Sequence, residues 1–228
     1  MTFPLMPLPF YSAGGGVTLT YVGTGTYSSP GGSFNLWGSI QEGDILVAQV
    51  GGRFVFSTAA ELKPSGWTTI DWKGWDEGFS DNSISLSYKV ASSSDSGAAI
   101  SSSSNWATVY ISIYRPDVPV TSVSLGGTVD WRRTSNANPP AQTAYASNSS
   151  VTTLVFGGGF SEVDMSASRS FSPTGPTVDY NFGRIIADNG YTSRMVSAHQ
   201  VPPASDFTID FGDNNKIEYT YAFYLEVS

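Results

Sequence analysis

The chain has no cysteine and only one histidine, His199, among its 228 residues. Without cysteine it can form neither disulfides nor thiolate metal sites. A zinc or iron site around His199 alone would need mostly carboxylate ligands, which these metals seldom accept. The sequence also lacks a Gly-x-Ser-x-Gly segment that would present a serine nucleophile. We therefore predict that the protein is not an enzyme and holds no metal or cofactor.

Charged side chains are also scarce, at 13% of the residues, and they sum to a formal net charge of −8. Binding a phosphate backbone requires clustered lysine and arginine side chains. Here only Arg132 and Arg133 are adjacent basic residues. The charge pattern therefore argues against a nucleic-acid partner.

Long apolar runs are missing as well, since no stretch approaches the roughly 20 apolar residues that span a bilayer. The N-terminal segment is apolar but carries no basic residue, and Pro4, Pro7 and Pro9 interrupt the helix that a signal peptide needs. We predict neither export nor a membrane partner.

From Val17 onward, β-branched and aromatic residues alternate with polar ones, and turn-forming residues interrupt them. The pattern predicts strands at 17–22, 45–50, 84–90 and 109–114. Residues 45–50 are almost wholly apolar, which indicates burial on both faces. In 84–90 the apolar positions alternate with Ser85, Ser87 and Lys89, which predicts one face in water.

Less regular runs predict further strands at 120–129, 151–156, 184–187, 195–199, 207–211 and 217–227. The last run is long and aromatic, so we expect a central strand there. Polar stretches at 136–150 and 166–181 predict long surface loops, and the best helix candidate, 58–63, is one or two turns long. Together these segments predict one all-β domain over 17–228, a two-sheet antiparallel sandwich of jelly-roll type.

Residues 1–16 are predicted to form an extended arm, because three prolines and large apolar side chains precede three consecutive glycines. Such an arm cannot fold on itself, and its large side chains would be costly to leave in water. Two hypotheses remain open: the arm binds a neighbouring subunit, or it covers the core of its own chain. The candidate partner-binding residues are Phe3, Leu5, Phe10 and Tyr11.

A second candidate surface is the aromatic-rich segment 67–79, which we interpret as a loop. Exposed tryptophan suits stacking on a sugar ring or filling a pocket on a partner. The candidate partner- or glycan-binding residues are Trp72 and Trp75, with Trp131 as a second position. Each of these side chains has the alternative of lying in the core.

Carboxylates offer two weaker hypotheses. Asp71, Asp76 and Glu77 lie near the tryptophans, as in a glycosidase cleft. Neighbours along a strand face opposite ways, so we disfavour their convergence on one bond. A calcium site is the other hypothesis, but a hairpin turn at 211–216 explains the same residues more simply. The oxygen ligands would come from Asp206, Asp210, Asp213, Asn214 and Asn215.

Four segments in the middle of the chain resemble a known module. They are Gly43-Asp44-Ile45-Leu46-Val47-Ala48, Pro64-Ser65-Gly66-Trp67-Thr68-Thr69-Ile70, Tyr88-Lys89-Val90-Ala91 with Asp95-Ser96-Gly97, and the run from Trp106-Ala107 to Tyr114-Arg115. In order and spacing they resemble a β-sandwich module of tailed-bacteriophage virion structural proteins, of the decoration and tail type. The segment 51–63 is longer than that pattern usually allows, and nothing after Pro116 matches it.

The resemblance implies a structural protein located in the virion. A capsid decoration or cement protein is the first expectation, followed by a tail or fibre subunit. Its partners would be other virion proteins and further copies of itself, with a trimer expected. The alternative is a carbohydrate- or receptor-binding module that uses exposed aromatic side chains to bind a surface glycan. A glycan-degrading enzyme is disfavoured because no convincing acid/base pair is found.

Overall fold

The computed structural model describes residues 16–27, 32–52, 62–75, 82–102, 106–133, 142–144, 152–164, 178–184, 191–200, 207–209 and 217–228. Within these ranges the chain forms strands and one short 3-10 turn, Ser93–Asp95, without an α-helix. The predicted all-β class with two antiparallel sheets is therefore confirmed. Most of the helix candidate at 58–63 lies outside the described residues.

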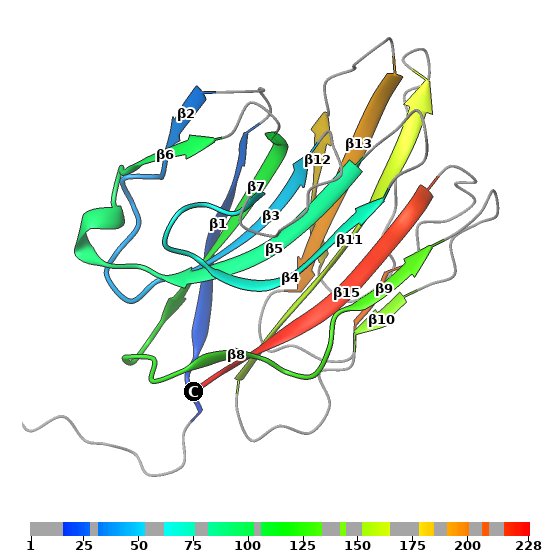
Figure 1. The fold of residues 1–228 in the computed structure, drawn as a ribbon. Coiled ribbons are helices and arrows are strands. Elements are labelled where there is room, and N and C mark those ends of the chain that lie inside the picture. Colours follow the sequence, from blue (N-terminus) through cyan, green and yellow to red (C-terminus); the bar gives the residue numbers. More distant parts are fainter. Residues whose placement is uncertain are drawn as a thin grey trace, which may run out of the picture.

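The first half of the chain forms a five-stranded sheet, here called the first sheet (Figure 1). Its strands are antiparallel and follow the order β1-β7-β3-β5-β4. They comprise β1 (Leu19–Tyr27), β3 (Ile45–Gly52), β4 (Thr68–Trp75), β5 (Asn82–Val90) and β7 (Trp106–Pro116). The predicted strands at 45–50, 84–90 and 109–114 all lie in this sheet.

The second half forms the second sheet, with the order β12-β13-β11-β15-β8 and with β9 also paired to β15. Its strands are β8 (Val123–Leu125), β9 (Asp130–Arg133), β11 (Thr152–Asp164), β12 (Val178–Arg184), β13 (Tyr191–Gln200) and β15 (Ile217–Val227). β15 lies between β11 on one side and β8 with β9 on the other. The prediction of a central C-terminal strand is confirmed.

The main core lies between the inner faces of the two sheets. Phe156 of β11 stacks on Phe223 of β15 with ring centroids 5.1 Å apart, and Tyr114 of β7 meets Phe156 edge-on at 5.9 Å. Each such side chain contributes on the order of 1.5–3 kcal/mol when buried. The fully buried members of this core from both sheets are Ile45, Val47, Ile84, Leu86, Tyr110, Tyr114, Leu154, Phe156, Tyr221, Leu225 and Val227.

A fully buried polar contact joins the sheets inside this core. The Tyr221 hydroxyl donates to Gln49 Oε1 at 2.6 Å, and both side chains are fully buried. Burial, with a smaller contribution from Tyr110, raises the pKa of Tyr221 well above its ordinary value. The Tyr221 hydroxyl therefore stays protonated, and remains a hydrogen-bond donor, at neutral and moderately alkaline pH.

The outer face of the first sheet is covered by a second apolar cluster. The cover comes from residues 36–40, from 62–67 and from the two-stranded sheet of β2 (Gly32–Asn35) and β6 (Ala99–Ser102). This cover corrects one prediction: Ser85 and Ser87 lie on the outer face but are fully buried, not in water. The predicted double burial of 45–50 is confirmed, since all of β3 is buried.

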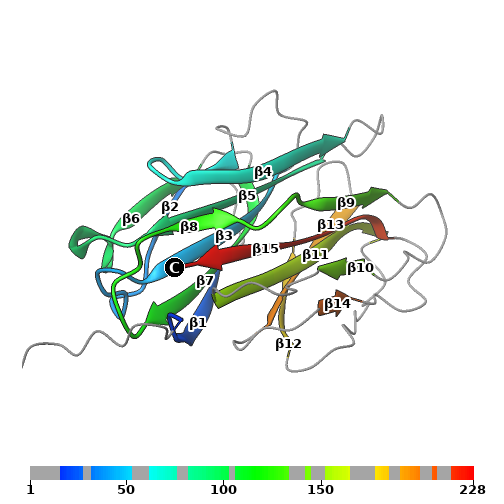
Figure 2. The ribbon, with the colours of Figure 1, turned by 90° about the horizontal axis from the view of Figure 1, so that it is seen from below.

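The outer face of the second sheet has a cover of the same kind. β10 (Gln142–Ala144) pairs with β14 (Phe207–Ile209), and this pair contacts β11 and β15 (Figure 2). Ala222 and Thr220 on that face of β15 are accordingly buried. Outer-face positions with polar side chains are thus buried in both sheets, at Ser85 and Ser87 in the first and at Thr220 in the second.

Several predicted boundaries in the second half are wrong. The run 120–129 is not one strand, because only Val123–Leu125 is extended there. β12 begins at Val178, inside the predicted loop 166–181, and β10 lies inside the predicted loop 136–150. In the first half, the predicted loop 67–79 is wrong over its described part, because Thr68–Trp75 forms β4.

Candidate binding surface

The best-formed polar site among the described residues lies where β3 begins and β7 ends. Arg115 binds Asp44 in a bidentate manner, from Nε to Oδ1 at 2.9 Å and from Nη2 to Oδ2 at 2.8 Å. Asp44 Oδ2 also accepts from the Gln41 backbone N–H at 2.8 Å, and Arg115 Nη2 donates to the Ser39 carbonyl. Asp44 is 1% exposed, so the pair fixes the 39–44 turn against β7. The hydrogen bond to Asp44 raises the pKa of Arg115.

Backbone hydrogen bonds tie this turn to the end of β5. Gly43 N–H donates to the Ala91 carbonyl at 2.8 Å, and Ala91 N–H donates to the Asp44 carbonyl at 2.7 Å. Just beyond, Lys89 Nζ donates to Asp95 Oδ1 at 2.6 Å, and the Ser92 N–H donates to Asp95 Oδ2 at 2.7 Å. The 39–44 turn and the 91–95 loop at this end of the first sheet are therefore each held by a buried carboxylate.

Asp95 should make part of the stability depend on pH. Burial acts to raise the pKa of Asp95, but the hydrogen bonds from Lys89 and Ser92 outweigh it and leave the pKa lowered. A carboxylate whose pKa is lower in the folded than in the unfolded protein stabilises the fold at pH values above its unfolded-state pKa. For Asp95 this contribution is lost as the pH falls below about 4. We expect Asp95→Asn to cost about 1 kcal/mol at pH 7 and little at pH 3.

Urea unfolding of both proteins at the two pH values checks this expectation. Glu42→Gln is the matched control, because it removes the same charge at an exposed position. An equal loss at pH 7 and pH 3 for Asp95→Asn would contradict the assigned role.

Beside the Asp44–Arg115 pair lies a pocket of about 490 Å³, which we call the end pocket. It is lined by residues 41–44, 90–91 and 115–120. Two of its apolar side chains are open to solvent: Val90 is 40% exposed and Val118 is 50% exposed. Its volume falls in the range of about 300–1,000 Å³ that is usual for ligand pockets.

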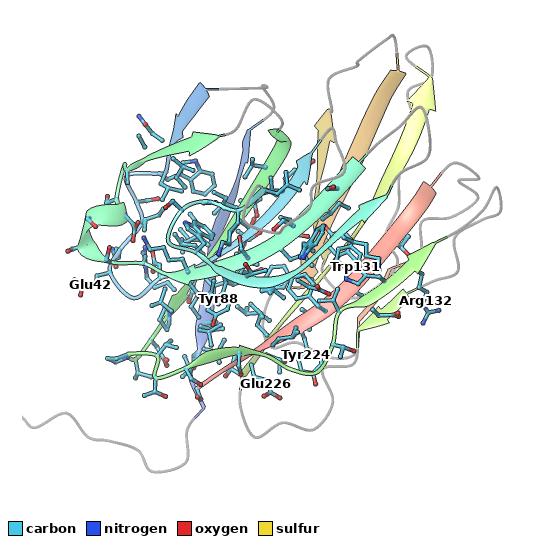
Figure 3. All side chains as sticks on the ribbon, viewed as in Figure 1. Glu42, Tyr88, Trp131, Arg132, Tyr224 and Glu226 are labelled. Carbon is cyan, nitrogen blue, oxygen red and sulfur yellow. The ribbon has the colours of Figure 1, made fainter. Side chains whose placement is uncertain are left out.

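The charges around the end pocket are mostly negative. Asp117 accepts the backbone N–H of Thr18 at Oδ1, and this hydrogen bond lowers the pKa of Asp117. Glu42 lies on an exposed turn at the same pocket, and Figure 3 labels it at the end of the molecule away from Trp131. Arg115 is the one cation among the lining residues, and Asp44 engages it. The pocket therefore suits an apolar, uncharged or cationic group.

The tryptophans predicted to bind a partner lie on strands. Trp72 and Trp75 belong to β4, and Trp131 belongs to β9. A bulge at Ile70 shifts the register of β4, so that Asp71 lies opposite Leu86 and Trp72 opposite Ser85. Asp71 therefore faces the other sheet, while the half-buried Trp72 faces outward.

Trp131 joins the two sheets along one side of the sandwich, where β9 and β4 run close to each other (Figure 2). Its indole Nε1–H donates to Asp71 Oδ2 at 2.7 Å. Its ring lies 5.2 Å from the ring of Tyr221, the residue opposite it on β15. These contacts give Trp131 a role in holding the sheets together (Figure 3).

We expect Trp131→Phe to lower the free energy of unfolding by about 1–2 kcal/mol, because Asp71 loses a donor in a partly buried position. A double-mutant cycle with Asp71→Ala measures the coupling of the two side chains. Trp37→Phe, the same change at a tryptophan that is 37% exposed, is the control and should cost much less. Additive losses in the cycle would show that the hydrogen bond does not carry the effect.

Several predicted residues lie outside the described part of the chain. These are the arm residues Phe3, Leu5, Phe10 and Tyr11, the carboxylates Asp76 and Glu77, and the oxygen-ligand residues Asp206, Asp210, Asp213, Asn214 and Asn215. His199 lies on β13, where the backbone register places it opposite Phe156 and Asp179. Among the described residues, no three His, Asp or Glu side chains are grouped so that they could hold a metal ion.

The sequence did not reveal the end pocket. Gly43-Asp44 was interpretable as a turn and Arg115-Pro116 as a strand end, but nothing in the sequence links positions 71 residues apart. Val90 and Val118 also looked like ordinary strand and loop residues. The resemblance gave the one hint of this site, because its four segments contain Asp44, Val90 and Arg115.

Comparison with known proteins finds no relative: no family model, no curated protein and no solved structure matches the chain. In the part of the chain that the structure describes, there is no helix of the length and apolarity that crossing a membrane takes. The residues and contacts described above are therefore the basis for assigning a function.

Proposed function

We propose that the protein is a structural component of a tailed-bacteriophage virion. A capsid decoration or cement protein is the first candidate, and a tail or fibre subunit is the second. The observation that carries the proposal is that the segments of the phage-like pattern, far apart in the sequence, contact one another in one unit, at one end and on the outer face of the first sheet.

The contacts of this unit involve each of the four segments. Asp44 of the first segment binds Arg115 of the fourth and shares a backbone hydrogen bond with Ala91 of the third. In the second segment, Trp67 N–H donates to the Pro64 carbonyl and closes the turn. Side chains from all four segments meet in the outer apolar cluster of the first sheet: Leu46, Ala48, Trp67, Ala91, Val109, Ile111 and Ile113.

This unit suits a scaffolding role on physical grounds. The central strands of the first sheet are buried on both faces, and the loops at one end of the sheet are fixed by charged hydrogen bonds. A rigid, closed scaffold leaves its loops and edges as the surfaces that contact other subunits. The proposed partners are other virion proteins and further copies of the chain, assembled as a homo-oligomer, with a trimer as the first expectation.

The jelly-roll topology stays a prediction within this proposal. The described strands up to Pro116 all belong to the first sheet or its cover, and those from Val123 onward to the second sheet or its cover. A topology in which both halves of the chain enter both sheets would need strands in the residues that are not described.

Purified virions of the phage that encodes the chain test the proposal. Mass spectrometry should find the chain in a fixed ratio to the major capsid protein, and cryo-EM should show its sandwich on the particle. Heads separated from tails by gradient centrifugation distinguish a decoration protein from a tail subunit. Absence of the chain from washed particles would sink the proposal.

Glycan binding is a second candidate, and one observation favours it. Trp37 is 37% exposed and lies over Gly23 and Gly25 of the edge strand β1, where an added Cβ would come within 2.9 Å and 3.1 Å of its ring. An exposed tryptophan held against two glycines of an edge strand resembles a stacking platform for a sugar ring.

A glycan array distinguishes this candidate from the first. Binding should be lost in Trp37→Ala, and Trp72→Ala tests the outward-facing tryptophan of β4 in parallel. Trp131→Phe is the comparison variant and should keep binding, because the indole of Trp131 is hydrogen-bonded between the sheets and does not serve as a stacking surface in this candidate. A silent array with folded wild-type protein would remove this candidate.

A further inference from the structure

Trp37 is an exposed ring between two buried neighbours. Leu36 and Ile40 are 7% and 3% exposed and belong to the outer apolar cluster of the first sheet, whereas Trp37 is 37% exposed and does not. Among the side chains that the structure describes, no other aromatic one is exposed to this degree. The chain therefore anchors the segment 36–40 on both sides of Trp37 and leaves its indole at the surface.

The indole of Trp37 lies flat on the outer face of the edge strand β1. A Cβ added at Gly23 would come within 2.9 Å of its Cζ3 atom, and one added at Gly25 within 3.1 Å of its Cζ2 atom and 3.4 Å of Nε1. These glycines pair with Ile113 and Ile111 of the outer apolar cluster, so both lie on the same face of β1. The two ends of the indole thus contact backbone, and its other face is open.

Hydrogen bonds hold the backbone on which Trp37 is mounted. The Trp37 carbonyl accepts the Gly97 N–H at 3.3 Å, and the Gly38 carbonyl accepts the Ser96 hydroxyl at 2.9 Å. The carbonyl that follows accepts Nη2 of Arg115 at 2.8 Å. An aromatic side chain that is fixed before it binds loses little conformational entropy when a ligand stacks on it.

The charges favour an uncharged ligand at this ring. Arg115 is the cation that hydrogen-bonds the segment 36–40, and Asp44 already engages it through both carboxylate oxygens. The whole chain carries a net charge of −8, which repels an acidic glycan before contact. A neutral pyranose needs no ionic partner, because it packs the C–H groups of one ring face on the indole.

We propose that Trp37 binds one pyranose ring of an uncharged glycan, and that Gly23 and Gly25 are the positioning residues that let its indole lie flat for this contact. The proposal rests on glycan binding, the second candidate function, and adds to it the class of ligand and two further residues. One open indole stacks on one sugar ring, so we expect a Kd on the order of 1 mM for a single site. Several copies in an assembly gain strength by avidity.

An NMR titration of the full-length protein tests the ligand class. The probes are the neutral methyl pyranosides of glucose, galactose and mannose, and the acidic probe is methyl glucuronide. The indole N–H signal of Trp37, assigned by its absence in Trp37→Phe, should shift saturably with a neutral probe, whereas the signal of Trp131 should not. The acidic probe should bind at least about fivefold more weakly.

Gly25→Ala tests the positioning role. Its methyl group would press on one end of the indole and tilt the ring off β1, so the Kd for the neutral probe should rise about fivefold or more. Gly38→Ala is the matched control, because a Cβ there meets nothing within 4 Å, and its Kd should stay within about twofold of the wild-type value. Circular dichroism verifies that each variant is folded.

Four outcomes decide the proposal. Binding of a neutral probe that is lost in Trp37→Ala, weakened in Gly25→Ala and kept in Gly38→Ala supports it. Binding that survives in Trp37→Ala, or that is unchanged in folded Gly25→Ala, would overturn it and leave glycan binding elsewhere on the protein in place. Tighter binding of the acidic probe would overturn the ligand class. No shift with any probe, together with a silent glycan array, would remove the glycan candidate and this proposal with it.

Discussion

Replacing Gly126 by alanine is expected to lower the free energy of unfolding by about 2 kcal/mol, and by more if the second sheet cannot adjust. Gly126 is buried between β8 and β9, and its N–H donates to the Tyr224 carbonyl of β15 at 3.1 Å. A Cβ at this position would lie 1.9 Å from Tyr224 Cε2 and 2.5 Å from Cδ2. The ring of Tyr224 covers the glycine and would have to leave its place.

A double-mutant cycle with Tyr224→Ala isolates this cause. Removing the ring makes room for the new methyl group, so the double variant should be about as stable as Tyr224→Ala alone, with a coupling of about 2 kcal/mol. Chemical unfolding monitored by tryptophan fluorescence gives the four free energies. If the two losses were additive, the contact with Tyr224 would not be the reason for the glycine.

Gly127→Ala provides the matched control one residue away. Gly127 has φ +106°, a backbone conformation that side chains disfavour, whereas its Cβ would stay 3.8 Å from the Tyr224 hydroxyl. The variant should therefore lose about 1–2 kcal/mol through backbone strain. Because Tyr224 is not involved, Tyr224→Ala should not reduce this loss.

The strands that could be predicted from the sequence are those whose composition reflects burial on both faces. Residues 45–50 are the clear case, since all of β3 is buried and a strand covered on both sides has little room for charged residues. Within 217–227, residues 220–223, Leu225 and Val227 are buried as well. Regular alternation also located β5 correctly, but it assigned the serine face to solvent. Ser85 and Ser87 are buried because residues 36–40 and 62–67, distant in sequence, cover them.

The missed strand β4 has a local reason. The bulge between Thr69 and Asp71 interrupts the period of two, so polar and aromatic residues no longer alternate regularly. Without the bulge, Asp71 would face outward and could not accept the hydrogen bond of Trp131 from the other sheet. The mixture of Trp and Asp that looked like a binding loop therefore includes a contact between the sheets.

The end pocket could not be predicted, because it depends on long-range pairing. Asp44 and Arg115 come together only after β3 and β7 align in register, with Ile45 opposite Tyr114. The sequence shows the turn and the strand end, but each alone fits many loops.

Replacing Asp44 by alanine is expected to have the largest effect of the polar substitutions, a loss of about 3 kcal/mol. Asp44 is 1% exposed and its carboxylate accepts three hydrogen bonds, two from Arg115 and one from the Gln41 backbone. Arg115 is one-third exposed, so water can solvate its guanidinium group after the substitution. The loss of stability should therefore lie near the lower end of the range for breaking a buried ion pair. Asp44→Asn should lose less, because it keeps the volume and one acceptor oxygen.

The exposed pair of Asp130 and Arg132 is the matched control within the same protein. Their side chains are 39% and 45% exposed, although Nη2 of Arg132 lies only 2.9 Å from Oδ2 of Asp130. Asp130→Ala should therefore cost less than about 1 kcal/mol. Chemical unfolding at low and high salt compares the two sites, and screening should change the Asp44→Ala loss less than the Asp130→Ala loss. Equal losses would contradict the view that burial of Asp44, and not its charge alone, fixes the 39–44 turn to β7.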